Sequence, residues 1–166
     1  MMRAFVLAVV AVTALMAPGC GGMVHVAPEQ ALAEALDPAA SATLSVRASG
    51  ALAGSGLAAG ALQQLRSSLY EGLVGRRLIA GIVPEGAGAR YGFDVVMISA
   101  GESSGGVRAG RDEVALDVEL VDLTDGRVLA RFVSRGRSPA PLFASGNAMA
   151  DAVDQAALGV VRMVSR

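Results

Sequence analysis

The segment LDVELVDLTDGRVLARF, Leu116 to Phe132, decides how the chain folds. From Val114 to Val121, apolar side chains stand at every second position and alternate with Asp117 and Glu119. A period of two with acids on one side is typical of a strand that has one buried and one solvated face. The segment therefore predicts a half-buried strand.

A turn and a second strand follow. Asp125-Gly126 precedes the apolar run from Val128 to Ser134. Because glycine tolerates the positive φ that a tight turn requires, this arrangement predicts a β-hairpin. The polar loop Arg135 to Gly146 then leads to a helix whose apolar residues recur at four-three-four-three spacing and share one face. These residues are Met149, Val153, Ala156, Val160 and Met163.

A strand and a helix are predicted upstream of the hairpin. Ala42 to Ala48 suits a strand, and the Gly-rich loop Ser49 to Gly56 connects it to a helix. Gly75 is expected to stop that helix, because glycine is common just after a last helical turn. The leucines of the helix are spaced along one side. They are Leu57, Leu62, Leu65, Leu69 and Leu73.

Two further runs, Arg77 to Val83 and Phe93 to Ala100, are predicted strands, and the loop Gly101 to Arg111 follows them. Helices with one apolar face pack on a sheet with one apolar face as two layers. The order predicts an α/β (α+β) two-layer sandwich. A strand-helix-strand unit comes first, then antiparallel strands and a C-terminal helix.

The N-terminus indicates export. Arg3 precedes a short apolar run from Ala4 to Met16, which is typical of a secretory signal peptide and too short to span a membrane as a helix. Small residues stand three and one places before Cys20, as in the lipobox of bacterial lipoproteins, which this segment resembles. The resemblance implies that Cys20 is acylated and becomes the new N-terminus. Ala17 stands where leucine is usual.

The predicted organisation has three parts. Residues 1–19 are a signal peptide, and residues 20–41 are a lipidated N-terminus and tether with a short helical stretch from Glu29 to Leu36. Residues 42–166 form a single α/β periplasmic domain. Cys20 is the only cysteine, so no intramolecular disulfide and no cysteine metal site can form. An ordinary cleavage site beside an incidental thiol remains the alternative to lipidation.

Beyond the lipobox, the chain resembles a family of proteobacterial envelope lipoproteins of unknown function. The likeness rests on Leu116 to Phe132 and the small-residue C-terminal helix. Relative to the family's D-x-x-[TS]-G turn, Asp122 to Gly126 has one inserted residue. In outline the chain is also similar to the periplasmic domain of the curli-secretion channel lipoprotein and to the TolB amino-terminal domain. These resemblances imply an accessory role in the envelope rather than a reaction.

The loop Gly54 to Gly60 supports an alternative function. It lies between a strand and a helix, where backbone N–H groups of a Gly-rich turn bind phosphate groups, and Glu85 would then be the ribose acid. The spacing is G-x-G-x-x-x-G, and Glu85 lies farther away than in a dinucleotide fingerprint. A small phosphate-containing ligand is therefore the second hypothesis, and a flexible Gly/Ala connection is the simpler reading.

No catalytic, cofactor or metal site is predicted. The single histidine, His25, lies in the expected tether, so neither a Ser-His-Asp triad nor a zinc site is expected. Asp117 and Glu119 are expected to form a cross-strand ion pair with Arg131 rather than an acid/base pair. On the last helix, Asp151 and Asp154 are interpreted as a solvated face.

We therefore expect a non-catalytic, lipid-anchored envelope lipoprotein on the periplasmic face, and Gly21 after Cys20 favours the outer membrane over the inner. Its expected partners are the membrane, through the anchor, and another envelope protein or a second copy. A strand edge or the Gly101 to Arg111 loop would provide the contact. The net charge is −1 and the arginines are scattered, so nucleic acid is not expected as a partner.

Overall fold

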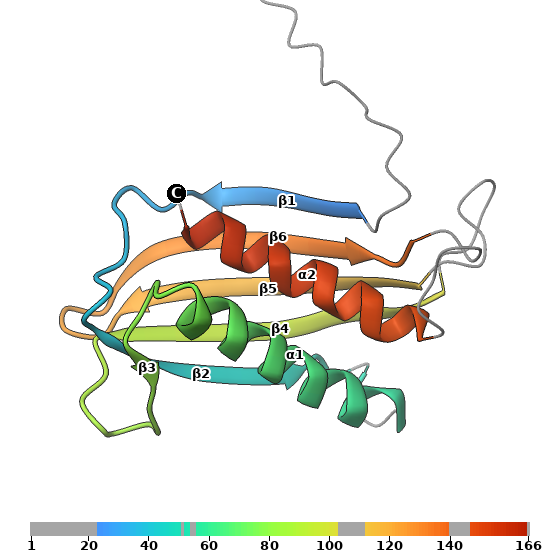
Figure 1. Ribbon diagram of the computed structural model, residues 1–166, viewed down its shortest axis with the longest axis horizontal. Helices are drawn as coiled ribbons and strands as arrows, with labels where there is room; N and C mark the ends of the chain where they lie inside the picture. The colour runs from blue at the N-terminus through green and yellow to red at the C-terminus, as the bar shows by residue number, and fades with distance from the viewer. Residues whose placement is uncertain (1–22, 51, 54–55, 103–111, 140–146, 166) are drawn as a thin grey trace, which may run out of the picture.

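The structure, a computed structural model, describes residues 23–50, 52–53, 56–102, 112–139 and 147–165. These residues form one six-stranded sheet with two helices packed on the same face (Figure 1). The elements are β1 (Met23–Gln30), β2 (Ser41–Ala48), α1 (Gly56–Gly75), β3 (Gly81–Ile82), β4 (Tyr91–Glu102), β5 (Asp112–Asp122), β6 (Arg127–Arg137) and α2 (Ala148–Val164). The predicted two-layer α+β architecture is confirmed.

The strand order across the sheet is β1-β6-β5-β4-β2-β3. β4, β5, β6 and β1 pair antiparallel in succession, whereas β2 pairs parallel with β4 on one side and with β3 on the other. β2, α1 and the short β3 form the predicted strand-helix-strand unit, since two parallel strands need a crossover between them. Within the described residues, no helix is long and apolar enough to cross a membrane.

The predicted hairpin is present. β5 and β6 pair from Glu113 opposite Arg137 to Asp122 opposite Arg127. Gly126 has φ 74° and its N–H donates to the carbonyl of Asp122 at 2.8 Å, so the turn uses the conformational freedom of glycine. The strands extend beyond the predicted runs at both ends.

Both predicted helices bury the faces that their spacing indicated. Leu65, Leu69 and Leu73 of α1 are fully buried, as are Val153 and Val160 of α2. They pack on the inward side chains of the central strands, and these make one continuous core. The central-strand members are Phe93, Val95, Met97, Val114, Leu116, Val118, Leu120 and Phe132.

α2 lies unusually close to β6. A Cβ added to Gly136 would stand 2.1 Å from the backbone nitrogen of Ala156, and one added to Gly159 would stand 2.1 Å from Oγ of Ser134. Ser134 is fully buried and donates a hydrogen bond to the carbonyl of Ala156 at 2.7 Å. Two glycines and a serine therefore permit backbone contact between the sheet and this helix.

The predicted helical stretch Glu29 to Leu36 is wrong, and so is the interpretation of residues 20–41 as a tether. Residues 23–30 are strand β1, which pairs with β6 along its length. Val24 and Val26 point toward α2, and Pro28 is tolerated because a proline fits an edge strand. The sheet therefore begins at Met23, about twenty residues earlier than expected.

The predicted strand Arg77 to Val83 is reduced to the two residues of β3. The chain leaves α1 through Arg77, which has φ 57°, and Ile79 is buried beneath the turn. The predicted loop Gly101 to Arg111 begins later than expected, because β4 continues through Glu102. The rest of that loop lies outside the described residues.

Candidate interaction surface

The sheet has two different edges, because among the described residues β1 pairs on one side only and β2 is covered on its outer side only by the two residues of β3. β1 pairs with β6 and has no further strand beside it among the described residues. β2 pairs with β4 over seven residues but with β3 only at Ser41 and Ala42. From Thr43 to Ala48, the outer side of β2 therefore has no paired strand in the described part of the chain. An unpaired edge is a template for another strand.

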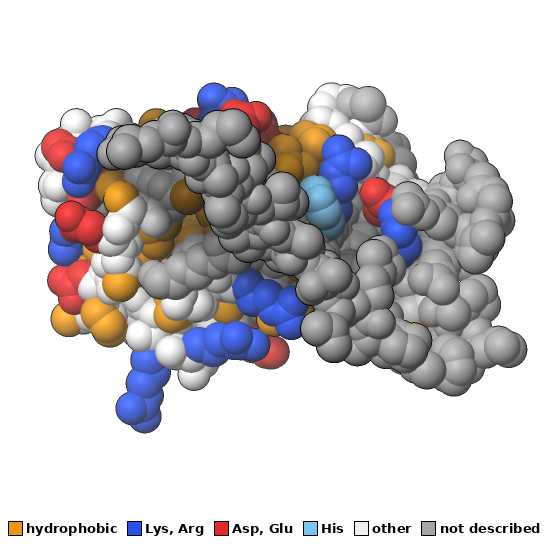
Figure 2. Space-filling view, turned by 90° about the horizontal axis from the view of Figure 1, so that it is seen from above, with side chains coloured by type: hydrophobic (Ala, Val, Ile, Leu, Met, Phe, Trp, Pro, Cys, Tyr) orange, Lys and Arg blue, Asp and Glu red, His pale blue; other side chains and the backbone are white. Residues whose placement is uncertain are grey.

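No described helix or strand covers the sheet face that turns away from the helices, and this open face carries charges of both signs. Arg131 on β6 lies 3.6 Å from Glu29 on β1 and 3.9 Å from Glu119 on β5, so one arginine links three strands. Arg135 lies 3.9 Å from Glu113, which also pairs with Arg137. Seen from the side of β1, acidic and basic side chains lie close together in several places (Figure 2).

These pairs confirm the predicted cross-strand contact of Glu119 with Arg131. Nearer β2, Arg47 donates to Asp94 at 2.7 Å, and this hydrogen bond and the charge of the carboxylate raise the pKa of Arg47. The partners in the Arg47 and Arg131 pairs are exposed, so these pairs contribute little to stability. Together they keep the open face solvated and nearly neutral, which leaves the edges as the better contact surfaces.

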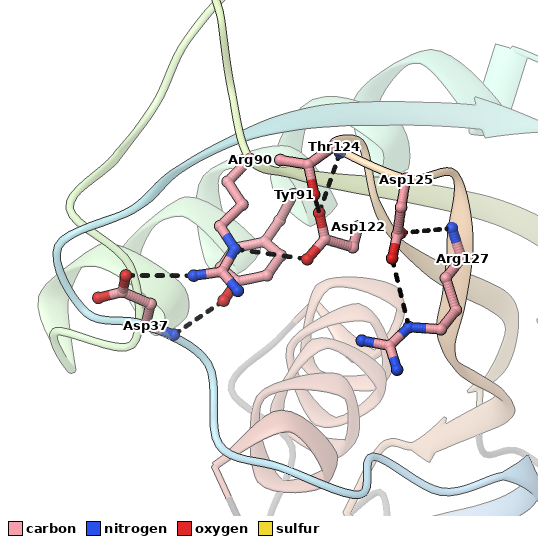
Figure 3. A network of polar contacts seen from close by, with 7 residues as sticks. All are labelled: Asp37, Arg90, Tyr91, Asp122, Thr124, Asp125 and Arg127. Carbon is pink, nitrogen blue, oxygen red and sulfur yellow. Dashed lines mark hydrogen bonds and ion pairs between the residues drawn. The ribbon is translucent and has the colours of Figure 1, made fainter.

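A polar cluster at one end of the sheet holds the segment that connects β1 to β2 (Figure 3). Arg90 pairs with Asp122 at 3.4 Å and with Asp37 at 3.3 Å, and its guanidinium lies 5.1 Å from the ring centre of Tyr91. The Tyr91 hydroxyl accepts a hydrogen bond from the backbone N–H of Asp37. The hydroxyl and backbone N–H of Thr124 donate to Asp122.

The cluster has a charged, buried acid at its centre. The pKa of Asp122 is lowered, first by the hydroxyl of Thr124, then by the Thr124 backbone N–H and by Arg90. No local sequence pattern predicts this cluster, because its members come from segments 32 to 54 residues apart. The cluster holds the β1–β2 connection against the end of the sheet through Asp37, and the carboxylate of Asp122 is already hydrogen-bonded to Thr124.

A cavity of about 150 Å³ lies beside the cluster. Apolar side chains from the β1–β2 connection and β6 line one part of it, and Arg90, Asp122, Arg127 and Glu34 line the other. Its arginines and acids offset one another in charge, and two of them already pair with each other. The cavity therefore shows no preference for an anionic or a cationic ligand.

Asp154 is exposed, as the predicted solvated face requires, but it also has partners on the other helix. Its carboxylate accepts hydrogen bonds from Gln64 at 2.9 Å and from Ser68 at 2.6 Å, both on α1. Asp154 is exposed but joins the two helices at the rim of a groove of about 420 Å³. Sequence spacing within one helix could not show a partner on the other.

Only some of the other residues singled out from the sequence lie in the described part of the structure. His25 lies on β1 opposite Arg135, not in a tether. Cys20, Gly54 and Ser55 lie outside the described residues, so neither acylation nor the phosphate-loop hypothesis is tested. Glu85 is exposed, well away from the start of α1 in sequence. Among the described residues, no group of three or more His, Cys, Asp or Glu side chains could hold a metal ion.

No protein-family model matches the chain, and no curated protein matches it. Solved structures do share its fold. A PelC dodecamer from Paraburkholderia phytofirmans superposes with a TM-score of 0.55 at 18% identity, covering 87% of this chain and 99% of that one. Protein XCC0632 from Xanthomonas campestris, of family DUF330, gives a TM-score of 0.53 at 16% identity, covering 79% of this chain and 88% of that one.

A minor lipoprotein from Acinetobacter baumannii matches at a TM-score of 0.39 and 12% identity, covering 74% of this chain and 91% of that one. A TM-score this low does not establish a shared fold. The likeness to the other two structures shows the fold: a sheet with two helices on one face, spanning nearly the whole of each solved chain.

Proposed function

We propose that this chain is a non-catalytic envelope lipoprotein, acylated at Cys20, whose domain assembles with protein through its sheet edges. The single observation that carries the assembly role is the sheet itself. In the described chain, its helices cover one face only. The outer sides of its two edge strands, β1 and β2, have no paired strand over most of their length. The partner is a second copy or another envelope protein.

The placement of the anchor supports the same proposal. Only Gly21 and Gly22 separate Cys20 from the first residue of β1. Three residues of extended chain span at most about 11 Å, so the acylated protein would hold the start of β1 close to the membrane surface. Copies anchored in this way share one orientation, which favours repeated contacts between them. The outer membrane is the proposed location.

A comparison adds to the case for self-association. A protein with this fold is described as a dodecamer. For the present chain, self-association is part of the proposal. Self-association through a sheet requires a strand edge that is unpaired in the monomer. β1 and β2 provide such surfaces.

Two measurements test the proposal. Intact mass of the membrane-extracted protein should show a chain that starts at Cys20 and carries acyl groups, and a Cys20→Ala variant should lack them. Crosslinking in intact envelopes, followed by mass spectrometry, should recover crosslinks from β1 or β2 to a protein. An unmodified chain with no crosslinked protein would refute it.

A further inference from the structure

We infer that the partner of each edge is the opposite edge of a second copy, so that β1 of one copy pairs antiparallel with β2 of the next and the sheet continues from copy to copy. This inference deepens the proposed function and rests on its assembly role. Three independent features of the two edges decide it: the direction of the strands, the direction of their backbone groups and the face on which the helices lie.

Strand direction comes first. β1 is antiparallel to β6, β6 to β5 and β5 to β4, while β4 is parallel to β2. β1 and β2 therefore run in opposite directions within one sheet, as Figure 1 shows. A second copy that extends the sheet in the same orientation brings its β1 antiparallel to β2, the arrangement in which opposite residues exchange two hydrogen bonds.

The backbone groups of β2 show which of its residues are available. The carbonyl of Ser41 accepts from Arg90 and the N–H of Ser49 donates to Met97, so odd-numbered residues face β4. The carbonyl of Ala42 accepts from Val83, so even-numbered residues face outward. Beyond β3, the outward groups belong to Leu44, Val46 and Ala48.

β1 has the matching pattern. The N–H of Ser138 donates to Asp112, so even-numbered residues of β6 face β5 and odd-numbered ones face β1. His25 lies opposite Arg135 and therefore faces β6, which leaves Val24, Val26 and Pro28 facing outward. Pro28 agrees with this assignment, since a proline in an edge strand directs its missing N–H away from the sheet.

The side chains of these outward-facing residues lie on the helix side at both edges. Val24 and Val26 approach Gly159 of α2, and Leu44 and Val46 pack against the core. Residues directly opposite one another in an antiparallel pair place their side chains on the same face. Pairing the two edges therefore keeps the helices of successive copies on one side and joins their half-buried apolar side chains into one layer.

The register follows from β3. A strand docked on β2 must stop before Ala42, whose outer side pairs with Ile82. A register that places Val26 opposite Val46 uses all three outward-facing residues of β2 beyond β3. Val24 then lies opposite Ala48, and Pro28 lies opposite Leu44. On the open face, Ala27 then lies opposite Ser45 in a pair without backbone hydrogen bonds, where Cα atoms are about 4.5 Å apart.

That distance lies within the range of a disulfide, whose Cα atoms are usually about 4.4–6.8 Å apart. We would mix two full-length proteins in a Cys20→Ala background, one with Ala27→Cys and the other with Ser45→Cys, and oxidise them. Within one copy, β1 and β2 are separated by three strands, about 19 Å, so a bond between these positions joins two molecules. The matched control pairs Ala27→Cys with Thr43→Cys, which displaces the second thiol by two residues.

A mixed disulfide that forms several-fold faster for Ser45→Cys than for Thr43→Cys is the expected result. Val46→Pro should abolish it without unfolding the protein, because the lost N–H faces outward. Oligomers by light scattering with equal crosslinking in both pairs would overturn this inference and leave the assembly role standing. A monomer at all concentrations with no crosslink would overturn the inference, and self-association with it.

Discussion

Oγ of Ser134 on β6 occupies the space that a side chain on Gly159 of α2 would need, 2.1 Å from the position of an added Cβ. Gly159→Ala should therefore destabilise the protein by roughly 1–3 kcal/mol, the usual cost of overpacking a core. Urea unfolding followed by circular dichroism measures it. An unchanged midpoint would show that the helix can move away from the sheet.

The same contact predicts a coupling. Ser134→Ala removes the hydroxyl that the new methyl group meets, so the double variant with Gly159→Ala should be more stable than the sum of the two single changes predicts. Residues in contact usually couple by about 0.5–3 kcal/mol. A double-mutant cycle of unfolding free energies checks the sign, and additive effects would contradict the contact.

Gly136 gives a second test of close approach, against backbone rather than a side chain. Gly136→Ala would bring a Cβ within 2.2 Å of the carbonyl oxygen of Ala152, which cannot rotate away. We expect a loss of at least about 1–3 kcal/mol. Gly60→Ala on α1 is the matched control, because nothing lies within 4 Å of its added Cβ and alanine favours a helix by about 1 kcal/mol. Equal effects of the two changes would contradict the packing.

Asp122 predicts a dependence of stability on pH. Its folded-state pKa lies below the value of about 3.9 in an unfolded chain, so its stabilising effect is complete above that value and is lost as the pH falls through the folded-state pKa. The free energy of unfolding of wild type should fall more steeply below about pH 4 than that of Asp122→Asn. Urea titrations at several pH values measure the difference. Asp125→Asn, the same substitution at an exposed position of the same turn, is the matched control.

Tyr91 predicts how firmly the β1–β2 connection is held. Tyr91→Phe keeps the ring under Arg90 but removes the hydroxyl that accepts from the Asp37 N–H. The loss should be about 0.5–1.5 kcal/mol, with faster proteolysis between Ala31 and Ala40. Tyr70→Phe, on the exposed side of α1, is the control. Equal cleavage rates in both variants would show that the hydroxyl does not hold this segment.

The parts of the fold that depend on local signals were predictable from the sequence. The β5–β6 hairpin is specified by an Asp-Gly turn and period-two alternation, and both helices by apolar spacing along one face. Strand β1 was not predictable in this way. Residues 23–30 have a weak pattern with a proline, and they form a strand because β6, about a hundred residues later, offers them an edge.

The candidate surfaces were predictable only in kind. A strand edge was the expected contact, but the sequence could not say which strands lie at the edges, because strand order is set by pairing between distant segments. The Arg90 cluster could not be predicted for the same reason. Arg90 meets Asp37 and Asp122 through the crossing of the β1–β2 connection over the sheet end, a relation that no local spacing encodes.

The pairing of β1 with β6 also imposes an order on folding. Met23 lies opposite Arg137, so the first strand of the sheet cannot form its ladder until more than a hundred further residues have been made. Contacts of such large sequence separation form slowly. During synthesis from the N-terminus, β2 to β5 can assemble before β6 has been made. β1 then has no strand to pair with until the last quarter of the chain, which contains β6, is complete.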